Sequence, residues 1–409
     1  MFFVVKKGKS TFKMTSTFST NIYCLYLIKL SKWLMLIMPI VALFYTDNGL
    51  DDFDIYILQA VYSVSVAILE IPSGYMADVF GRKKSLVIGS LLGTLGYGIY
   101  SFSSGFYGFL WAEVILGLGG SFISGSDSAM LYESLAAMKK KGWYFRLEGR
   151  ITSLGHFAET IAALGGGLIA ASLSYRAVYF SQTLIAGLAI PAAFLLLEPP
   201  REKHISRPGW SHILTVCKQS LVHNRKLSSA LLFSSLIGTC TLCMAWTSQV
   251  YFVSMGLTEK SITPLWVLLN LTVALVAAFA SRIVDKIGHI PAILVIMIAI
   301  PGGFILLGVF SLLPALIVLF VFYTIRGFAT PLLKDLVNSY CGSETRATVL
   351  SIRSMIIRIS FAVLGPFIGS LSSGYSLLFA LKLSGTILLI LSLLAGFFLL
   401  AVLSDDLKG

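Results

Sequence analysis

Charged residues are scarce in this chain. Asp, Glu, Lys and Arg together make up 12% of its 409 residues, about half the share found in soluble domains. Hydrophobic residues make up 56%, and the mean hydropathy is +0.86. Because so few charges cannot cover a soluble fold of this size, the composition excludes an ordinary soluble protein and predicts that lipid covers much of the surface.

The sequence also lacks the motifs of soluble catalysis and of metal binding. It has no P-loop, no HExxH and no GxSxG, which argues against an enzyme and against an ATP-driven pump. Cys240 and Cys243 form a CxxC inside an apolar run, but no second pair or nearby histidine completes a metal site. The stretch "SGSDS" at 124–128 has no histidine near it in the sequence, which argues against an intramembrane hydrolase. We therefore expect no enzyme activity, no metal and no cofactor.

Acidic residues are fewer than basic ones, and 19 acids against 31 cations give a net charge of +12. The cations lie in short gaps between apolar runs, a placement typical of membrane topology and not of nucleic-acid binding. Most of them face the cytoplasm if the N-terminus does, whereas the opposite gaps hold Arg176 and Lys260. This asymmetry predicts a multi-pass protein of the inner membrane with both termini in the cytoplasm.

Long apolar runs recur along the whole chain, and a membrane-spanning helix needs about 20 mostly apolar residues. We place twelve spans near 24–46, 54–78, 84–103, 106–133, 151–173, 176–197, 227–254, 261–284, 289–310, 313–338, 348–372 and 376–402. The first follows a basic, Ser/Thr-rich start that resembles the beginning of a signal sequence. It is long and lacks a small-residue cleavage site, so we expect it to remain as a span.

A polar, basic segment with three prolines interrupts the apolar runs at 198–226 and divides the chain into halves. We therefore expect an all-α membrane protein with twelve transmembrane helices in two pseudo-symmetric six-helix bundles. Its expected parts are a cytoplasmic N-terminal segment (1–20), the first bundle (21–197), the cytoplasmic central loop (198–226), the second bundle (227–402) and a cytoplasmic tail (403–409).

One polar stretch between two spans is repeated in the second half. "GYMADVFGRKKS" at 74–85 separates the second and third spans, and "SRIVDKIGH" at 281–289 occupies the same place in the other half. The aligned pairs are Asp78 with Asp285 and Gly81 with Gly288, at a constant shift of 207 positions (81 to 288). A shift near half the chain length predicts two structurally repeated halves.

With this motif, the twelve spans and the central division, the chain resembles the major facilitator superfamily. The resemblance rests on the pattern G-x-x-x-D-x-x-G-R-K, formed here by Gly74, Asp78, Gly81, Arg82 and Lys83. It implies transport by alternating access, in which two bundles rock around a central site. It also implies that Asp78 latches the cytoplasmic side by pairing with loop cations and facing the start of span eleven. A carboxylate at a helix N-terminus is favoured by about 0.3–1 kcal/mol.

Neighbouring residues complete the expected inner gate. Glu70, Gly74 and Asp78 are spaced by four, so they share a helical face, which favours a gate role for Glu70 over a substrate contact. Gly74 and Gly81 are expected to allow a close backbone approach and a tight turn. Lys83 and Lys84 could instead be topology anchors alone. The gate and motif residues are Gly74, Asp78, Gly81, Arg82, Lys83, Glu70, Asp285 and Gly288.

Two positions depart from the pattern of drug-exporting members of the family. In span four, "WAEVILGLGGSF" has Glu113 near the place where those members often carry an arginine. In span five, "TIAALGGGLI" keeps the glycines but lacks the Gly-Pro pair, which occurs instead at Gly365 and Pro366 in span eleven. These departures weaken an assignment as multidrug antiporter but not one as transporter.

Ionisable residues within spans cost at least about 2.5–3.5 kcal/mol each at mid-depth, so each one needs a function or a partner. The first half carries the acids Glu70, Glu113, Asp127 and Glu159, and the second half carries the bases Arg326, Arg353, Arg358 and Lys382. In one reading, acids of one bundle pair with bases of the other as the bundles rock. In a second, Arg326 and Arg358 bind an anionic substrate while Asp127 or Glu159 carries a proton. Static pairing that only holds helices together is the third.

Other polar residues are weaker candidates. Arg353 is shallow and could reach the inner surface instead. Asn270 is a candidate for the lining of a polar pocket, and His156, one turn from Glu159, belongs either to a proton relay or to the ordinary satisfied polar groups. The substrate and coupling candidates are Asp127, Glu159, Glu113, Arg326, Arg358, Arg353 and Asn270.

The predicted function is secondary active transport of a small organic molecule that bears a carboxylate or another anionic group. We expect proton-coupled efflux by proton antiport, and a secreted metabolite, a siderophore or an amphipathic drug fits as substrate. The alternatives are import of a metabolite or siderophore by the same fold and, in a different class, a membrane scaffold or sensor that transports nothing. The expected partners are the substrate, a proton or other coupling ion and the lipid bilayer; we expect a monomer and no nucleic acid.

Overall fold

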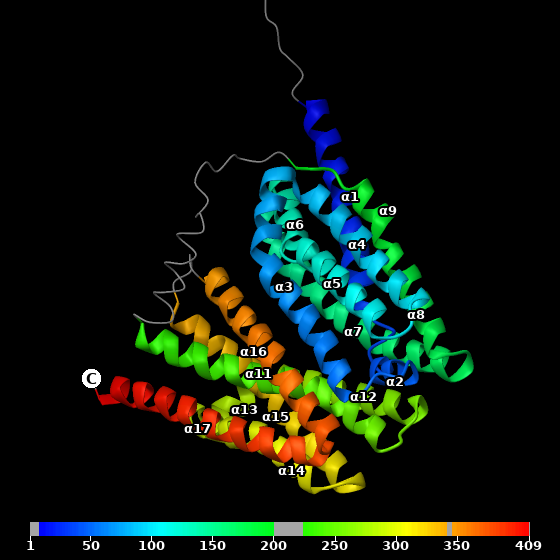
Figure 1. Ribbon diagram of the computed structural model, residues 1–409. Helices are drawn as coiled ribbons and strands as arrows, with labels where there is room; N and C mark the ends of the chain where they lie inside the picture. Colours follow the sequence, from blue (N-terminus) through cyan, green and yellow to red (C-terminus); the bar gives the residue numbers. More distant parts are fainter. Residues whose placement is uncertain (1–7, 200–223, 342–345, 409) are drawn as a thin grey trace, which may run out of the picture. The chain divides into compact units, whose positions relative to one another are not determined.

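The computed structural model describes residues 8–199, 224–341 and 346–408, and the regular structure in these parts is entirely helical (Figure 1). The helices are α1 (Gly8–Trp33), α2 (Val41–Asp47), α3 (Asp52–Phe80), α4 (Arg82–Phe102), α5 (Phe106–Ile123), α6 (Ser126–Ala137), η1 (Lys141–Trp143), α7 (Tyr144–Ser172), α8 (Tyr175–Gly187), α9 (Ala189–Leu195), α11 (Arg225–Ser254), α12 (Glu259–Ala278), α13 (Ala280–Ile287), α14 (His289–Val309), α15 (Leu312–Ser339), α16 (Arg346–Gly374) and α17 (Leu377–Lys408). The predicted all-α fold class is confirmed.

Ten helical segments in the described parts are long and apolar enough to cross a membrane. The two other predicted spans are present in a different form. The first is interrupted between Trp33 and Val41, which separates α1 from α2, and the fifth is represented by the apolar end of α7, Phe157–Ser172. The twelve predicted spans therefore all have helical counterparts, ten of which meet the length and hydropathy of a full span.

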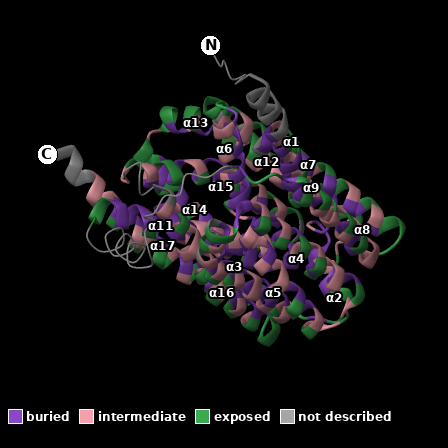
Figure 2. Ribbon diagram, turned by 90° about the horizontal axis from the view of Figure 1, so that it is seen from above, coloured by how far each residue is buried: buried purple, intermediate pink, exposed green. Residues whose placement is uncertain are grey.

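Large hydrophobic side chains are exposed along these helices, as Figure 2 shows by the exposed positions scattered over the helix surfaces. Examples are Ile68, Phe157, Leu168, Leu184, Val363 and Leu394. A soluble protein seldom exposes so much apolar surface, because its transfer to water is unfavourable by about 25 cal/mol per Å². Lipid removes this cost, so the exposed faces agree with the helix lengths in indicating a multi-pass membrane protein.

The chain forms two compact units. The first comprises residues up to Phe44 together with Val64–His204, and the second comprises Tyr45–Ser63 together with Ile205–Gly409. The first part of α3 therefore belongs to the second unit and the rest of α3 to the first.

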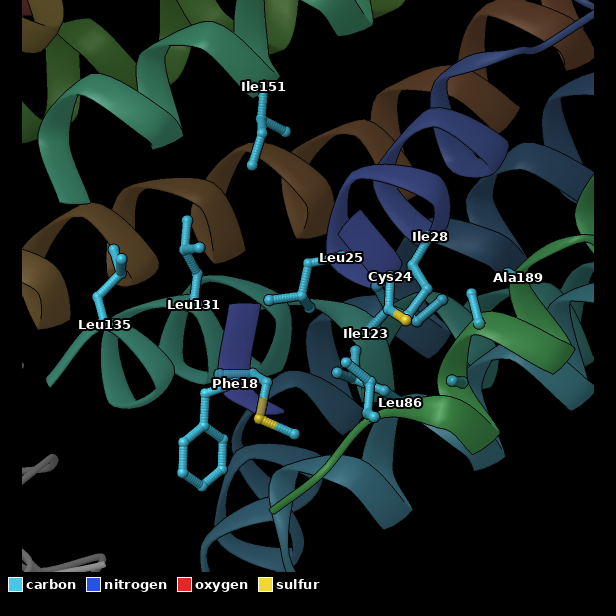
Figure 3. Close-up of a cluster of buried hydrophobic side chains, with 14 of the residues drawn as sticks. Phe18, Cys24, Leu25, Ile28, Leu86, Ile123, Leu131, Leu135, Ile151 and Ala189 are labelled. Carbon is cyan, nitrogen blue, oxygen red and sulfur yellow. The ribbon is translucent and has the colours of Figure 1, made fainter. Parts of the chain in front are cut away.

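The core of the first unit forms around α1. Figure 3 shows Leu25 and Ile28 of α1 among apolar side chains from other helices of the unit, including Leu86 of α4, Ile123 of α5 and Leu131 of α6. Glycines shorten the distances between the helices: a Cβ on Gly89 would lie 2.9 Å from the carbonyl oxygen of Gly119. Such small residues let membrane helices approach closely enough for dispersion forces to hold them.

Span four of the first unit is broken. α5 ends at Ile123 and α6 begins at Ser126, and Gly125 between them has φ +74°. A residue with a Cβ is strained at that φ, so the glycine permits the break. The break places Asp127 in the first turn of α6, where the helix dipole favours a negative charge.

In the second unit, α14 packs along α17, and α11 packs against both α16 and α17. The α14–α17 contact is close at Gly385, where a Cβ would lie 2.8 Å from the backbone nitrogen of Ile305. The start of α3 joins this unit through polar contacts. Tyr56 shares a 2.7 Å hydrogen bond with Thr247 of α11, and Ser372 of α16 donates a short hydrogen bond to Asp52.

Candidate functional site

The repeated motif adopts the same backbone geometry in both halves. Gly81, between α3 and α4, has φ +114° and ψ 143°, and Gly288, between α13 and α14, has φ +88° and ψ 155°. Each glycine N–H donates to the carbonyl four residues earlier, Ala77 in one case and Val284 in the other. This part of Ramachandran space is essentially restricted to glycine. The predicted repeat and the predicted tight turn at Gly81 are therefore confirmed at the level of backbone conformation.

The N-terminus of α4 is capped by a distant carboxylate. Glu198 Oε1 accepts a hydrogen bond from the Arg82 amide at 2.9 Å, and Glu198 Oε2 accepts one from the Lys83 amide at 2.8 Å. These amides have no partner within the helix, and the carboxylate also interacts favourably with the helix dipole. A Cβ on Gly81 would lie 3.2 Å from Glu198 Oε2. The motif glycine thus provides both the turn and the space for this carboxylate.

Arg82 is a buried residue of the motif and not a surface anchor. Its side chain is 9% exposed, and its Nε lies 3.5 Å from Glu133 Oε1 of α6, which joins the start of α4 to α6. Lys83 is half-buried and Lys84 is exposed. Arg82 therefore has a structural ion pair, whereas the interpretation of Lys83 and Lys84 as topology anchors stays a prediction.

The other residues proposed for the inner gate are Gly74, Asp78, Glu70 and Asp285. Gly74 lies within α3, and a Cβ added there would meet no described atom within 4 Å; the close approach expected at this glycine stays a prediction. The side chain of Asp78 lies outside the described residues, and its latch role stays a prediction. Glu70 is half-buried on α3, and Asp285, the counterpart of Asp78 in the second half, is exposed.

The first unit contains a charged cluster made by α1, α6 and α7. Lys29, whose side chain is 8% exposed, places Nζ 2.6 Å from Glu148 Oε1 and 3.6 Å from Asp127 Oδ2. Ser128 joins the same cluster, because it accepts from Lys29 at 3.2 Å and donates to Glu148 at 2.8 Å. The lysine ammonium is therefore surrounded by three side-chain oxygens from two helices.

The cluster bears on the three readings of the charges within spans. Asp127 forms its salt bridge with Lys29 of its own half, whereas pairing between the halves, an anion site with a proton carrier, and static pairing all stay predictions. Lys29 lies within the predicted first span, and its burial identifies it as a base of this half. Tyr144, at the start of α7, also lies beside the cluster: burial first, and the Glu148 carboxylate second, raise the pKa of the Tyr144 phenol.

A second carboxyl of the first unit lies among aromatic rings. Glu113 is 6% exposed, and its Oε1 accepts a 2.7 Å hydrogen bond from Tyr100. The Tyr100 ring stacks on Phe109 at 5.1 Å and on Tyr179 at 4.9 Å between centroids. Phe44 packs on Tyr179 at 4.1 Å. Glu113, which lies near the place where the resemblance to drug exporters leads one to expect an arginine, is therefore a buried carboxyl in an aromatic cluster.

Three arginines of the second unit have different surroundings. Arg353 of α16 donates from Nε to Ser234 Oγ of α11 at 2.6 Å and lies near the Ser234 carbonyl as well. Arg326 of α15 is half-buried and lies over the Tyr323 ring, with 5.4 Å from Cζ to the centroid. Arg358 of α16 is half-buried, and its Nε is buried without a hydrogen-bond partner. Within the described part of the chain, neither Arg326 nor Arg358 forms an ion pair with a carboxylate.

The other predicted substrate and coupling candidates are Asn270, Glu159 and His156. Asn270 donates to the carbonyl of Trp266 one turn earlier, at 2.9 Å, so at least one of its donors serves its own helix. Glu159 is half-buried in α7, and the side chain of His156 lies outside the described residues. Within the described parts, no group of three or more His, Cys, Asp or Glu residues could hold a metal ion.

Sequence reasoning missed three residues that the structure brings into the candidate site. Glu198 falls in the predicted central loop, Glu148 and Glu133 carry no predicted role, and all three bind groups distant in sequence. The sequence did contain one signal that could have identified two of these residues. Glu133 and Glu148 are the acids of a strongly basic segment, and an acid among cations next to a span is a candidate for pairing with a buried base.

These observations define a class. Helices of membrane length, apolar outer faces, charged groups sequestered between helices and a backbone repeat between two halves are the features of a polytopic transporter built from repeated bundles. Comparison with known proteins makes the assignment specific. The model of the Major Facilitator Superfamily matches residues 29–366, and the chain belongs to this family.

Individual relatives are distant. An uncharacterized MFS-type transporter of Methanocaldococcus jannaschii is 22% identical over 345 residues, which cover 83% of this chain and 86% of that protein. The efflux pump FUS6 of Gibberella fujikuroi is 24% identical over 170 residues, 40% of this chain and 30% of the pump.

Solved structures share the fold. A mutant form of the nucleoside transporter NupG matches with a TM-score of 0.73 at 13% identity, over 95% of this chain and 99% of that one. A D-xylose-proton symporter matches with a TM-score of 0.71 at 16% identity, over 93% and 96%. The predicted family is confirmed, and it is a family of transporters.

Proposed function

We propose that this protein is a secondary transporter that exports a small organic anion by alternating access, with Arg326 and Arg358 as the cations that bind the substrate. The observation that carries the proposal is the state of these two side chains. Each is half-buried in a helix of the second unit, and neither has a carboxylate partner among the described residues.

A half-buried guanidinium without a carboxylate partner carries a positive charge that no described acid compensates. Arginine stays protonated, so it cannot escape the cost of burial by losing its charge. Arg326 has the face of Tyr323, a cation–π contact worth about 0.5–2 kcal/mol, which offsets part of that cost. A substrate carboxylate or phosphate that accepts two parallel hydrogen bonds from a guanidinium supplies the missing partner.

The first unit shows the opposite condition. Its buried cations Lys29 and Arg82 both have carboxylate partners. This contrast supports a division of roles in which the second unit binds the anion and the first unit couples transport to an ion. We propose the cluster of Lys29, Asp127 and Glu148 as the principal coupling site, with Glu159 as a further candidate for carrying the proton.

The direction of transport is proposed from the relatives. FUS6 and LUC4 are efflux pumps that match part of this chain, which supports export, and we propose proton antiport as its mechanism. Import is the second candidate because the vacuolar amino acid uptake transporter fnx2 of Schizosaccharomyces pombe is 22% identical over 186 residues. A carboxylate-bearing metabolite or siderophore fits either direction.

The remaining predictions complete the proposal. We propose that both termini face the cytoplasm and that the protein works as a monomer in the inner membrane. The inner gate consists of the motif at 74–85 and its counterpart at 281–289, and Glu198 secures the turn at Gly81 by capping α4.

The test uses three matched arginine variants. Purified protein is screened by thermal shift against organic anions, and the hit is followed by binding and by flux in proteoliposomes. Arg326→Gln and Arg358→Gln are each expected to weaken binding at least about 30-fold, since removal of one partner of a buried charge pair costs about 2 kcal/mol or more. Arg353→Gln, the control, changes an arginine that already has protein partners in Ser234. The anion site is refuted if both substitutions leave affinity unchanged.

Coupling is tested separately. Asp127→Asn and Glu159→Gln are each examined for net flux driven by a proton gradient and for substrate exchange without one. Loss of gradient-driven flux with intact exchange supports a coupling role, because exchange requires the gates but no net proton movement. Unchanged gradient dependence in a variant removes that residue from the coupling role.

A further inference from the structure

A basic surface follows directly after span four. Five cations lie within twelve residues, at Lys139, Lys140, Lys141, Arg146 and Arg150, and all five are exposed. Span four ends at Ala137, so the first of these cations stands two residues beyond the end of a membrane-length helix. None of the five forms an ion pair with a described residue.

The acids of the same segment do not balance this charge. Between residues 128 and 158 the acids are Glu133 and Glu148. Glu133 pairs with Arg82 and Glu148 pairs with Lys29, two cations that are themselves buried. The segment therefore separates its charges: the acids lie against buried bases, and the cations lie at the surface.

The backbone contributes an independent observation. α6 ends in a Schellman motif, in which the Lys140 amide donates to Leu135 O at 2.8 Å and the Lys139 amide donates to Ala136 O at 2.9 Å. The residue at C′ of this motif is usually glycine because its φ is positive. Here it is Lys139, with φ +59°, the one described residue other than glycine that has a positive φ. Lysine therefore occupies a position where glycine has less strain, directly before two further lysines.

Aromatic rings accompany the cations. Trp143 is 54% exposed and Tyr132 is 45% exposed. Lys140 Nζ lies 5.2 Å from the Trp143 ring centroid, and Lys141 Nζ lies 5.8 Å from that of Tyr132. Exposed Trp and Tyr next to a span are typical of the lipid headgroup level, where the ring body meets lipid and the polar atom meets water.

We infer that residues 132–150 form a binding surface for anionic phospholipid headgroups. The lysines and arginines bind the phosphates, and Trp143 and Tyr132 lie at the level of the glycerol backbone. Charge complementarity favours this occupant, because juxtamembrane clusters of this size attract anionic lipid in proportion to their cations. The inference is independent of the substrate and of its direction of transport.

The test compares lipids and variants in neutral detergent. The melting temperature and the apparent affinity are measured with added phosphatidylglycerol, phosphatidylcholine or inorganic phosphate. We expect phosphatidylglycerol to bind at least about tenfold more tightly than phosphatidylcholine, and inorganic phosphate to stabilise little. The triple variant Lys139→Gly, Lys140→Gln, Lys141→Gln is expected to lose about 100-fold in affinity for phosphatidylglycerol, at about fivefold per cation. The control is the double variant Arg225→Gln, Lys226→Gln, at the exposed start of α11. It is expected to retain the wild-type affinity for phosphatidylglycerol.

The single variant Lys139→Gly separates lipid binding from folding. Without lipid it is expected to melt above the wild type, because glycine relieves the strain at φ +59°. With phosphatidylglycerol it is expected to bind about fivefold more weakly. The inference is overturned if the triple variant keeps the wild-type preference for phosphatidylglycerol, or if inorganic phosphate or phosphatidylcholine binds as tightly as phosphatidylglycerol.

Discussion

The two motif glycines permit a controlled measurement of what the cap on α4 contributes. Gly81→Ala and Gly288→Ala place the same methyl group on turns of nearly the same geometry, with φ +114° and +88°. Each substitution is expected to cost about 1–3 kcal/mol of backbone strain. Their surroundings differ: the new Cβ meets the Glu198 carboxylate at 3.2 Å in one case and Pro291 Cδ at 3.4 Å in the other.

The difference between the variants gives the energy of the cap. At 3.2 Å the carboxylate must shift by a few tenths of an ångström, which lengthens its hydrogen bonds of 2.9 and 2.8 Å to the Arg82 and Lys83 amides. Glu198 is exposed, so the cap is worth about 1 kcal/mol, as for an ordinary N-cap. Gly81→Ala should therefore destabilise the protein by about 1 kcal/mol more than Gly288→Ala does.

A double-mutant cycle tests this explanation. Unfolding free energies in detergent are compared for Gly81→Ala, Glu198→Ala and the double variant, with Gly288→Ala as the strain reference. If Glu198 causes the excess, the cost of Gly81→Ala should fall to that of Gly288→Ala once Glu198 is absent, with a coupling energy of about 1 kcal/mol. Strictly additive effects, or equal costs for the two glycine variants in the wild-type background, would refute the reasoning.

Three further substitutions test other contacts by unfolding measurements in detergent. Lys29→Met should destabilise the protein by about 3–5 kcal/mol, because it leaves the Asp127 and Glu148 carboxylates without their cation; Lys29→Arg should restore part of the loss. Gly166→Ala should cost about 3 kcal/mol or more, since its Cβ would overlap the backbone carbonyl oxygen of Leu36, whereas Gly165→Ala, with its nearest atom at 3.5 Å, should be nearly neutral. Tyr100→Phe should cost about 1.5–3 kcal/mol by removing the 2.7 Å hydrogen bond to the Glu113 carboxyl, and an unchanged stability would show that this bond contributes nothing.

Features that depend on local chemistry were predictable from the sequence. Membrane-length helices follow from apolar composition, because each span must satisfy its own backbone in lipid. The turn at Gly81 and its copy at Gly288 follow from the need for glycine at a positive φ. The interruption of span four was not predicted, although Gly125 lies at the break, because a glycine within an apolar run is compatible with a continuous membrane helix.

Contacts between residues that are far apart in the sequence were not predictable from the sequence. Glu198 is 116 residues from the amide that it caps, and Glu148 is 119 residues from Lys29. Nothing in the residues next to Glu198 indicates a cap, since that role exists only where the end of α9 meets the start of α4. The same holds for the arginines, which look alike in the sequence but differ in the structure, where Arg353 is bound by Ser234 and Arg358 is not bound by a described residue.

The sequence by itself determined that lipid surrounds this protein, that its fold is all-α and where its repeated turns lie. These features follow from hydropathy and glycine stereochemistry, which act over a few residues. The tertiary structure alone decided which buried charges are balanced. Electrostatic energy in a poorly solvated interior depends on separations of a few ångströms, and those separations are set by the packing of helices that are far apart along the chain.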